Sequence, residues 1–456
     1  MDLKYLLFLL FLTPVILFGQ HSIKGTFAPA GEFEIALLYK VDPTHSNYVT
    51  NSPIAADGSF EIKLDSTVTK GMYRITYAVP QEEYNFDIIY NGEEDIELKF
   101  NSETGVEFIA SMENKLLESY TNSMLMITNS IGNYFRDGSK TKDSLALASI
   151  FKTQKETQNG YEEASNGMIA SHFVKANRPY IPEDIIDVNT YVEGLKANYF
   201  NHVDFNNPIL QRSNFLTERM LNYVFGMSSQ NGNEAEDYKR NIDVFSTAMQ
   251  NAPDEIKKSL FTDLWEQMVD LKLESVANFI AEKYLMDLSV KLNDQQLLQA
   301  LILHQNITIG NNAPDFSIEI TKDKETVKTL LSKLDIAEHY VVAFWSSSCS
   351  HCLKEIPELH EFTKTFEEGK LKVIAIGLED EPYGWKTLTY DFPNFFHVYG
   401  EGKWDNEIGN SYGVTATPTY FILDKDKKIA LKPEDFEELK QFFETSDSQP
   451  SIEDKQ

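Results

Sequence analysis

Hydrophobic and polar residues change their spacing twice along this chain, near residues 105 and 308. In the first part they alternate one by one over short runs such as Phe60–Leu64, which is typical of half-buried β-strands. Turn residues such as Asp57-Gly58 and Asn91-Gly92 separate the runs. We therefore predict a small all-β sandwich or barrel over residues 21–105. The expected strands are Phe33–Tyr39, Phe60–Leu64, Tyr73–Tyr77, Phe86–Tyr90 and Ile96–Phe100.

The middle of the chain, residues 106–305, changes to a helical spacing of apolar residues. Ile256–Met268 and Val276–Leu288 place them at i, i+3, i+4 and i+7, the pattern of amphipathic helices. Breaks rich in polar residues, Gly or Pro divide the region into segments, and we predict a central α-helical bundle of about seven or eight helices. No residues in this region have a catalytic spacing. The breaks lie near 137–139, 177–182, 228–233 and 251–253.

The last part, residues 308–445, alternates strand and helix patterns, which predicts an α/β domain. Pro433–Glu444 reads as a closing amphipathic helix, and the polar residues 446–456 as a disordered tail. The expected strands are Val341–Trp345, Lys372–Gly377, Phe395–Tyr399 and Thr419–Asp424.

The first twenty residues differ from all that follows. Lys4 precedes the almost wholly apolar run Tyr5–Phe18, and Gly19 offers a small residue for cleavage, which predicts a signal peptide over residues 1–20. The run is shorter than the ~20 residues of a membrane-spanning helix, although an uncleaved anchor stays open. We therefore expect export to the periplasm or cell envelope. The net charge of −29 argues against nucleic acid as a partner.

The chain has only two cysteines, Cys349 and Cys352, and they lie between a predicted strand and a predicted helix. A C-x-x-C pair at such a junction is typical of a dithiol redox site. At a helix N-terminus the first thiol has a lowered pKa, and its thiolate is the reactive form. A disulfide between cysteines so close in sequence would do little to stabilise a large fold, so a structural disulfide is the weaker interpretation. A second ligand cluster for zinc is missing, and Leu353 stands where haem attachment needs histidine, so we expect no metal or cofactor.

At these residues the C-terminal third resembles the thioredoxin-like proteins of the TlpA/ResA type, which are exported bacterial thiol-disulfide oxidoreductases. The N-terminal two thirds are more loosely similar to the β and helical regions that precede such domains, and no chemistry is assigned to them. The matching positions are Ala313–Phe316, Phe344-Trp345, Cys349 and Cys352, Lys354–Pro357 and Gly413–Asp424.

The resemblance implies a thioredoxin-like fold and a role for several residues. Cys349 would be the exposed nucleophile that forms a mixed disulfide, and Cys352 the buried resolving thiol. Pro418 would follow a cis peptide bond beside the cysteines. The Thr417 backbone and Trp345 would contact an extended substrate.

Two further side chains near the cysteines have a functional and an ordinary interpretation. Glu355 matches an acid found near the thiols in ResA-type proteins and could accept the proton of Cys352, or it could be a solvated helix residue. His351, when protonated, could stabilise the Cys349 thiolate, or it could be an exposed residue with little effect. The chain also departs from its relatives, with Ser348 in place of a usual tryptophan and Ala343 where classical thioredoxins have aspartate.

We therefore expect an exported thiol-disulfide oxidoreductase whose partners are protein thiols and disulfides and an upstream membrane electron donor or acceptor. Two alternatives stay open. In one, the β and helical domains bind an envelope partner or glycan and the redox activity is secondary. In the other, the protein is an isomerase that forms a homodimer through the helical region. The sequence leaves the direction of electron flow undetermined.

Overall fold

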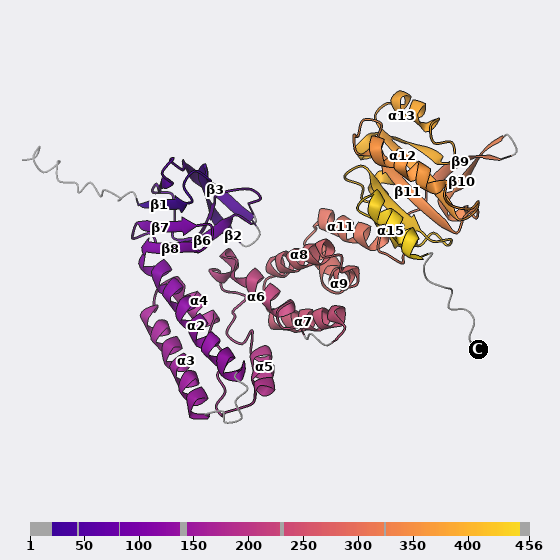
Figure 1. Cartoon of the computed structure of the whole chain (residues 1–456). Helices are drawn as coiled ribbons and strands as arrows, with labels where there is room; N and C mark the ends of the chain where they lie inside the picture. The colour runs from indigo at the N-terminus through magenta and orange to yellow at the C-terminus, as the bar shows by residue number, and fades with distance from the viewer. Residues whose placement is uncertain are drawn as a thin grey trace, which may run out of the picture. The chain divides into compact units, whose positions relative to one another are not determined.

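The computed structural model describes residues 21–42, 45–81, 83–136, 144–228, 232–322 and 325–446. The expected signal segment and the polar residues after 446 lie outside these ranges. Contacts divide the chain into two compact units, Met1–Leu264 and Trp265–Gln456. Leu264 and Trp265, the residues on either side of this division, both belong to helix α8 (Asp254–Asp270), which Figure 1 labels. In the described ranges, no helix has both the length and the apolar character needed to cross a membrane.

The first unit begins with two four-stranded sheets, of strand order β4-β1-β7-β8 and β3-β2-β5-β6. Apolar side chains from both sheets, including Ile23, Leu38, Ile75 and Leu98, form one buried cluster. The N-terminal part is therefore β-rich, as its alternating pattern predicted. The strands are β1 (Ser22–Ala28), β2 (Ile35–Asp42), β3 (His45–Pro53), β4 (Ser59–Lys63), β5 (Gly71–Thr76), β6 (Asn85–Tyr90), β7 (Ile96–Asn101) and β8 (Gly105–Ala110).

Strands β1, β3 and β8 were absent from the sequence prediction. In β1, Gly25 interrupts the apolar alternation, but the packing requires glycine there. A Cβ atom at Gly25 would lie 2.0 Å from the carbonyl oxygen of Leu98 on the neighbouring strand β7. Strand β3 is mostly polar, and β8 is largely exposed. Neither therefore carries the pattern of a half-buried strand.

The helical region follows, and its described residues form ten α-helices, more than the seven or eight predicted. The expected helix Val276–Leu288 is divided into α9 (Glu274–Ile280), the π-turn η3 (Ala281–Leu285) and α10 (Met286–Lys291). The other helices are α2 (Met112–Arg136), α3 (Ser144–Ala164), α4 (Ala170–Ala176), α5 (Val188–Ala197), η2 (Leu210–Arg212), α6 (Phe215–Val224), α7 (Glu234–Ala248) and α11 (Gln295–Asn306).

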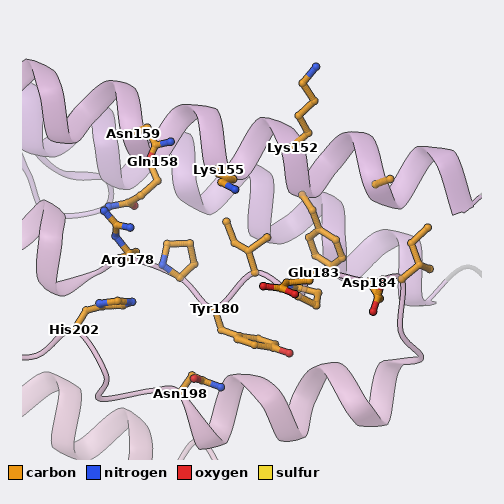
Figure 2. A pocket seen from close by; sticks show the side chains of 16 residues that line it. Lys152, Lys155, Gln158, Asn159, Arg178, Tyr180, Glu183, Asp184, Asn198 and His202 are labelled. Atoms are coloured by element: carbon orange, nitrogen blue, oxygen red, sulfur yellow. The ribbon is translucent and has the colours of Figure 1, made fainter.

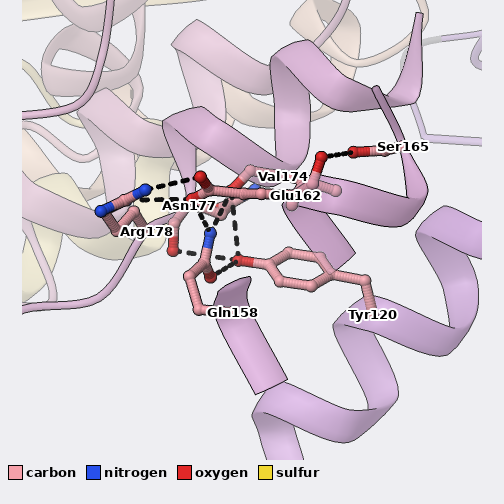
Figure 3. Close-up of polar contacts among 7 residues, drawn as sticks. All are labelled: Tyr120, Gln158, Glu162, Ser165, Val174, Asn177 and Arg178. Atoms are coloured by element: carbon pink, nitrogen blue, oxygen red, sulfur yellow. Dashed lines mark hydrogen bonds and ion pairs between the residues drawn. The ribbon is translucent and has the colours of Figure 1, made fainter. Parts of the chain in front are cut away.

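A buried polar network joins α2, α3 and α4 (Figure 3). The Tyr120 hydroxyl donates to Oε1 of Gln158 at 2.8 Å, and Nε2 of Gln158 donates to the Val174 carbonyl at 2.9 Å. Glu162, on the same face of α3 as Gln158, accepts hydrogen bonds from Nε and Nη2 of Arg178. Burial raises the pKa of Tyr120, so its hydroxyl remains a donor at neutral pH and helps to fix the three helices.

The second unit contains a five-stranded sheet of order β13-β12-β11-β14-β15. Strand β11 pairs in parallel with β12 and antiparallel with β14. Its residues alternate between two buried clusters, Val342 and Phe344 on one face and Ala343 and Trp345 on the other. The α/β character agrees with the prediction. The strands are β11 (His339–Trp345), β12 (Leu371–Glu379), β13 (Phe396–Glu401), β14 (Thr419–Leu423) and β15 (Ile429–Leu431).

Helices α12 (Cys352–Thr363) and α15 (Phe436–Ser446) pack on the face of the sheet that contains Ala343 and Trp345. Elements that the sequence prediction missed complete this unit. They are strand β15, the antiparallel pair β9 (Ser317–Lys322) and β10 (Glu325–Leu330), the turns η4 (Leu331–Lys333) and η5 (Lys403–Asp405), and helices α13 (Pro382–Thr389) and α14 (Glu407–Ser411).

Helices α9 to α11, which were predicted to belong to the central region, share the second unit with the α/β sheet. The Glu274 carboxylate of α9 pairs with the Lys432 ammonium and accepts the Ile309 backbone N–H at 2.7 Å. The Leu303 side chain of α11 lies against Gly413, where an added Cβ would meet it at 3.3 Å. Polar and apolar contacts therefore join these helices to the last part of the chain.

Candidate active site

Cys349 and Cys352 lie where the buried strand β11 gives way to helix α12. The backbone N–H of Cys349 donates to the Ser346 carbonyl at 3.1 Å, and the Cys349 carbonyl accepts from the Leu353 N–H at 3.1 Å. Cys352 is the first residue of α12. Cys349 is thus held in the turn that opens the helix, as its place in the sequence predicted.

The two sulfur atoms have different surroundings. Cys349 is half-buried and Cys352 is fully buried, and both are free thiols. The Cys349 Sγ accepts a hydrogen bond from the Cys352 backbone N–H at 3.2 Å. It also donates to the Thr417 carbonyl at 3.1 Å. Of the two thiols, only that of Cys349 is therefore accessible enough to attack an external disulfide.

These surroundings move the two pKa values in opposite directions. For Cys349, burial raises the pKa, but hydrogen bonds involving the Cys352 thiol and backbone N–H outweigh it, and the net pKa is lowered. For Cys352, burial is the largest cause and the Cys349 sulfur the next, and both raise the pKa. Near neutral pH, Cys349 therefore forms a thiolate more readily than an ordinary cysteine, while Cys352 stays protonated.

His351 contributes to this site through its backbone. Its side chain is exposed, and its backbone hydrogen bond is among the causes that lower the pKa of Cys349. The φ and ψ angles of His351 are −65° and −42°, so it already has helical geometry. This contact comes from the main chain, and the effect of the imidazole stays a prediction.

The Thr417 carbonyl contacts the Cys349 sulfur from the loop before β14, and Pro418 follows it in the chain. The Thr417–Pro418 peptide bond is cis, as the resemblance implied, and both residues are half-buried. Trp345 requires a correction. Its side chain is only 1% exposed and packs against Phe392, so it supports the site from the core and has no surface to offer to a substrate.

Glu355 is held by two donors. Its Oε2 accepts the Tyr420 hydroxyl at 3.1 Å and the Phe436 backbone N–H at 3.2 Å. The residue is half-buried, in the first turn of α12. The structure thus fixes the carboxylate three residues after Cys352 on α12, and it adds Tyr420, which sequence reasoning had missed.

Glu379 is a second residue that the sequence did not reveal. It is the last residue of β12, is 6% exposed, and accepts the backbone N–H of Ser347. In the same loop, the hydroxyl groups of Ser346 and Ser348 lie 2.9 Å apart. Glu379 therefore anchors the serine loop that leads into Cys349. A buried acid at the end of an apolar strand was the only available signal.

The described residues contain no group of three His, Cys, Asp or Glu side chains suited to hold a metal ion. A cleft of about 550 Å³ does occur in the first unit, between α3 and the segment 178–185. Figure 2 shows Arg178 and His202 at one end and Glu183 and Asp184 at the other. The Arg178 charge is already paired with Glu162, and the chain's cysteines both lie in the other unit, so this cleft supplies no thiol chemistry.

Comparisons with known proteins match the same part of the chain. A family model described as thioredoxin-like matches residues 338–429. The thiol-disulfide oxidoreductase ResA of Bacillus thuringiensis (strain Al Hakam) is 30% identical over 125 residues, covering 27% of this chain and 69% of the relative. ResA of Geobacillus thermodenitrificans is 24% identical over 151 residues, covering 30% and 78%. A solved thiol-disulfide oxidoreductase of Bacteroides fragilis is 21% identical with a TM-score of 0.27, covering 30% of this chain and 99% of that one.

Proposed function

This chain belongs to the thioredoxin-like thiol-disulfide oxidoreductases of the ResA type, and on that premise we propose that it exchanges disulfides with protein substrates through Cys349 and Cys352. The observation that carries the proposal is the difference between the two thiols. Cys349 is half-buried with a lowered pKa, whereas Cys352 is buried with a raised pKa. A nucleophile and a resolving thiol need this division of properties.

In the reducing direction, the Cys349 thiolate attacks one sulfur of a substrate disulfide. A bond forms between Cys349 and that sulfur, and the other substrate sulfur leaves as a thiolate. Cys352 then loses its proton and attacks Cys349, which releases the second substrate sulfur and leaves a Cys349–Cys352 disulfide. The substrate gains two electrons and the enzyme loses two. In the oxidising direction the same steps run in reverse.

Three neighbouring residues have roles in this proposal. Glu355, fixed by Tyr420 and the Phe436 backbone, receives the Cys352 proton as a general base. Thr417, whose carbonyl lies at the Cys349 sulfur, offers its backbone to an extended substrate beside Pro418. The backbone N–H of His351 stabilises the Cys349 thiolate.

The remaining expectations from the sequence belong to the same proposal. The protein is exported, and an upstream membrane partner resets its dithiol after each exchange. Residues 21–105 form a β-sandwich, which the single core shared by two sheets supports. Residues 106–264 form a helical bundle, and α9 to α11 share a compact unit with the thioredoxin-like domain of residues 308–445. A homodimer through the helical region belongs to the isomerase alternative.

The proposal can be tested by measuring how fast the whole chain reduces insulin disulfides, with dithiothreitol as the electron donor that regenerates the dithiol. The parent should accelerate the reaction, and Cys349→Ser should lose all acceleration because the attacking thiol is gone. Without dithiothreitol, which would itself cleave a mixed disulfide, Cys352→Ser should react with insulin and fail to resolve the product, so a covalent adduct should accumulate on Cys349.

The two serine variants are matched controls for each other, because each removes one sulfur from the same turn. An adduct on Cys352 in the Cys349→Ser chain would reverse the assigned roles. A parent chain that leaves insulin and small model disulfides untouched would contradict the proposed activity.

A further inference from the structure

Tyr420 is a buried tyrosine whose hydroxyl contacts Glu355, and its own part in the exchange can be derived from its surroundings. It lies on β14 directly opposite Ala343 of β11, and directly opposite residues of antiparallel strands point to the same face of the sheet. Its side chain is 0% exposed and belongs to the same buried cluster as Cys352. Because Ala343 is small, it leaves room for the phenol ring on this face.

The phenol hydroxyl connects β14 to helix α12. It donates to Oε2 of Glu355 at 3.1 Å, and the Phe436 backbone N–H at the start of α15 donates to the same oxygen at 3.2 Å. Among the described residues, Oε1 of Glu355 has no hydrogen-bond donor. Glu355 follows Cys352 by three positions on α12, and side chains so spaced lie on one helix face.

The electrostatics of Tyr420 agree with this placement. Burial is the largest cause that raises its pKa, and the charges of Glu355, Cys352 and Cys349 raise it further. The phenol therefore stays protonated throughout the range in which Cys349 titrates, and it donates in every step. Glu355 and the two cysteines are the titratable groups that face it, and α15 contributes the Phe436 backbone.

We propose that Tyr420 is a positioning residue for the resolving step, in which its hydroxyl holds Glu355 so that Oε1 takes the proton of Cys352. The S–H bond of Cys352 breaks and its proton moves to Oε1. The Cys352 sulfur then bonds to Cys349, and the bond between Cys349 and the substrate breaks, with its electron pair on the substrate sulfur. This inference rests on the proposed disulfide exchange and names a residue that controls its second half.

Stopped-flow kinetics of the whole chain with a small chromogenic disulfide can separate the two halves of the exchange. Tyr420→Phe keeps the ring and removes only the hydroxyl. We expect mixed-disulfide formation to stay within about twofold of the parent and resolution to slow about tenfold, because a mobile carboxylate is a poorer base. The pH profile of resolution should move to higher pH.

Tyr412→Phe is the matched control. Tyr412 is also a buried tyrosine of this unit, but its hydroxyl donates to the Pro314 carbonyl at 2.7 Å and does not contact Glu355. The Tyr412→Phe variant should lose stability as Tyr420→Phe does, but its rate of resolution should keep the pH profile of the parent. Adding Tyr420→Phe to Glu355→Gln should slow resolution no further, because the Tyr420 hydroxyl acts only through the Glu355 carboxylate, which the Gln substitution has already removed.

Glu355→Asp provides a second route if Tyr420→Phe does not fold. It keeps a carboxylate but withdraws it from the phenol by one methylene, and resolution should slow with the same shift of its pH profile. Resolution at the parent rate and pH profile, in either folded variant, would overturn the role of Tyr420. An inactive parent would instead refute the proposed exchange itself, so the two failures are distinguishable.

Discussion

At the level of single residues, the two thiols differ because their neighbours differ. The Cys349 sulfur accepts a backbone N–H and is half-buried, whereas the Cys352 sulfur is enclosed by the core. A hydrogen bond to the charged form lowers a thiol pKa, and burial raises it. Both effects occur within one turn of chain, and so a pair of chemically identical side chains acquires two roles.

The first prediction concerns the titration of these thiols. Because its pKa is lowered, Cys349 should be present as thiolate below the pH at which a free cysteine, of pKa about 8.5, ionises. The rate of iodoacetamide labelling should therefore rise through a transition at lower pH than in the urea-unfolded chain. Cys352 should remain unlabelled in the folded chain throughout. Equal labelling of the two cysteines at neutral pH would contradict the assignment.

The second prediction separates the backbone of His351 from its side chain. His351→Ala keeps the N–H, and His351→Pro removes it at a φ of −65° that proline adopts without strain. A lost hydrogen bond to a charged group should raise the pKa of Cys349 by about one unit in the proline variant. The alanine variant should change it less, which labelling rates against pH would measure. A larger shift in the alanine variant would assign the effect to the imidazole.

The site was predictable from the sequence to the extent that it is local. Cys349, Cys352 and Glu355 all lie at the junction of strand β11 and helix α12, and the C-x-x-C spacing identifies this junction in the sequence. Tyr420 and Glu379 reach the site from other strands, 65 residues beyond Glu355 and 32 residues beyond Ser347. Their proximity depends on the pairing of β14 and β12 with β11, and a periodic pattern does not reveal which strands pair.

At the level of elements, close packing beside the site depends on a glycine. Gly377 of β12 lies against the indole ring of Trp385 on α13, and an added Cβ would fall 1.9 Å from Nε1. At Gly384, the residue before Trp385, an added Cβ would lie 3.3 Å from the hydroxyl oxygen of Ser347, in the loop that leads into Cys349. Helix α13 therefore joins the sheet to the active-site loop, and Gly377 makes room for it.

The third prediction follows from this contact. Gly377→Ala should displace Trp385 and lower the free energy of unfolding by about 1–3 kcal/mol through overpacking. Gly160→Ala is the control, because Gly160 lies in helix α3 with open space around its Cβ position. It should be neutral or stabilise the chain by up to about 1 kcal/mol. Urea unfolding would measure both, and equal stability of the two variants would show that α13 adapts freely.

Whether an element could be predicted from the sequence depends on how deeply it is buried. Strands β11, β12 and β14 are buried on both faces and read as continuous apolar runs. Exposed elements such as β10 have no such pattern, because side chains in contact with solvent need not be apolar. The π-turn η3 leaves the apolar period of Val276–Leu288 intact while dividing the helix, so periodicity alone could not show the interruption.

At the level of the whole molecule, the sequence suggested a boundary near residue 308, whereas the contacts place α9 to α11 with the α/β sheet. The Glu274–Lys432 pair is mostly shielded, with side chains 13% and 27% exposed, and Glu274 also accepts the Ile309 N–H. Shielded charge-assisted contacts of this kind are stronger than surface ion pairs. The helices are thus part of the body that carries the dithiol.

The fourth prediction compares two fragments of the chain. A fragment of residues 265–456 and one of residues 308–456 should both exchange thiols with a model disulfide, because both contain Cys349, Cys352, Glu355 and Tyr420. The longer fragment should have the higher Tm, since it retains Glu274 and the Leu303 contact with Gly413. Circular dichroism and disulfide reduction would be measured on each. A longer fragment that is folded yet inactive, while the whole chain is active, would show that residues before 265 complete the site.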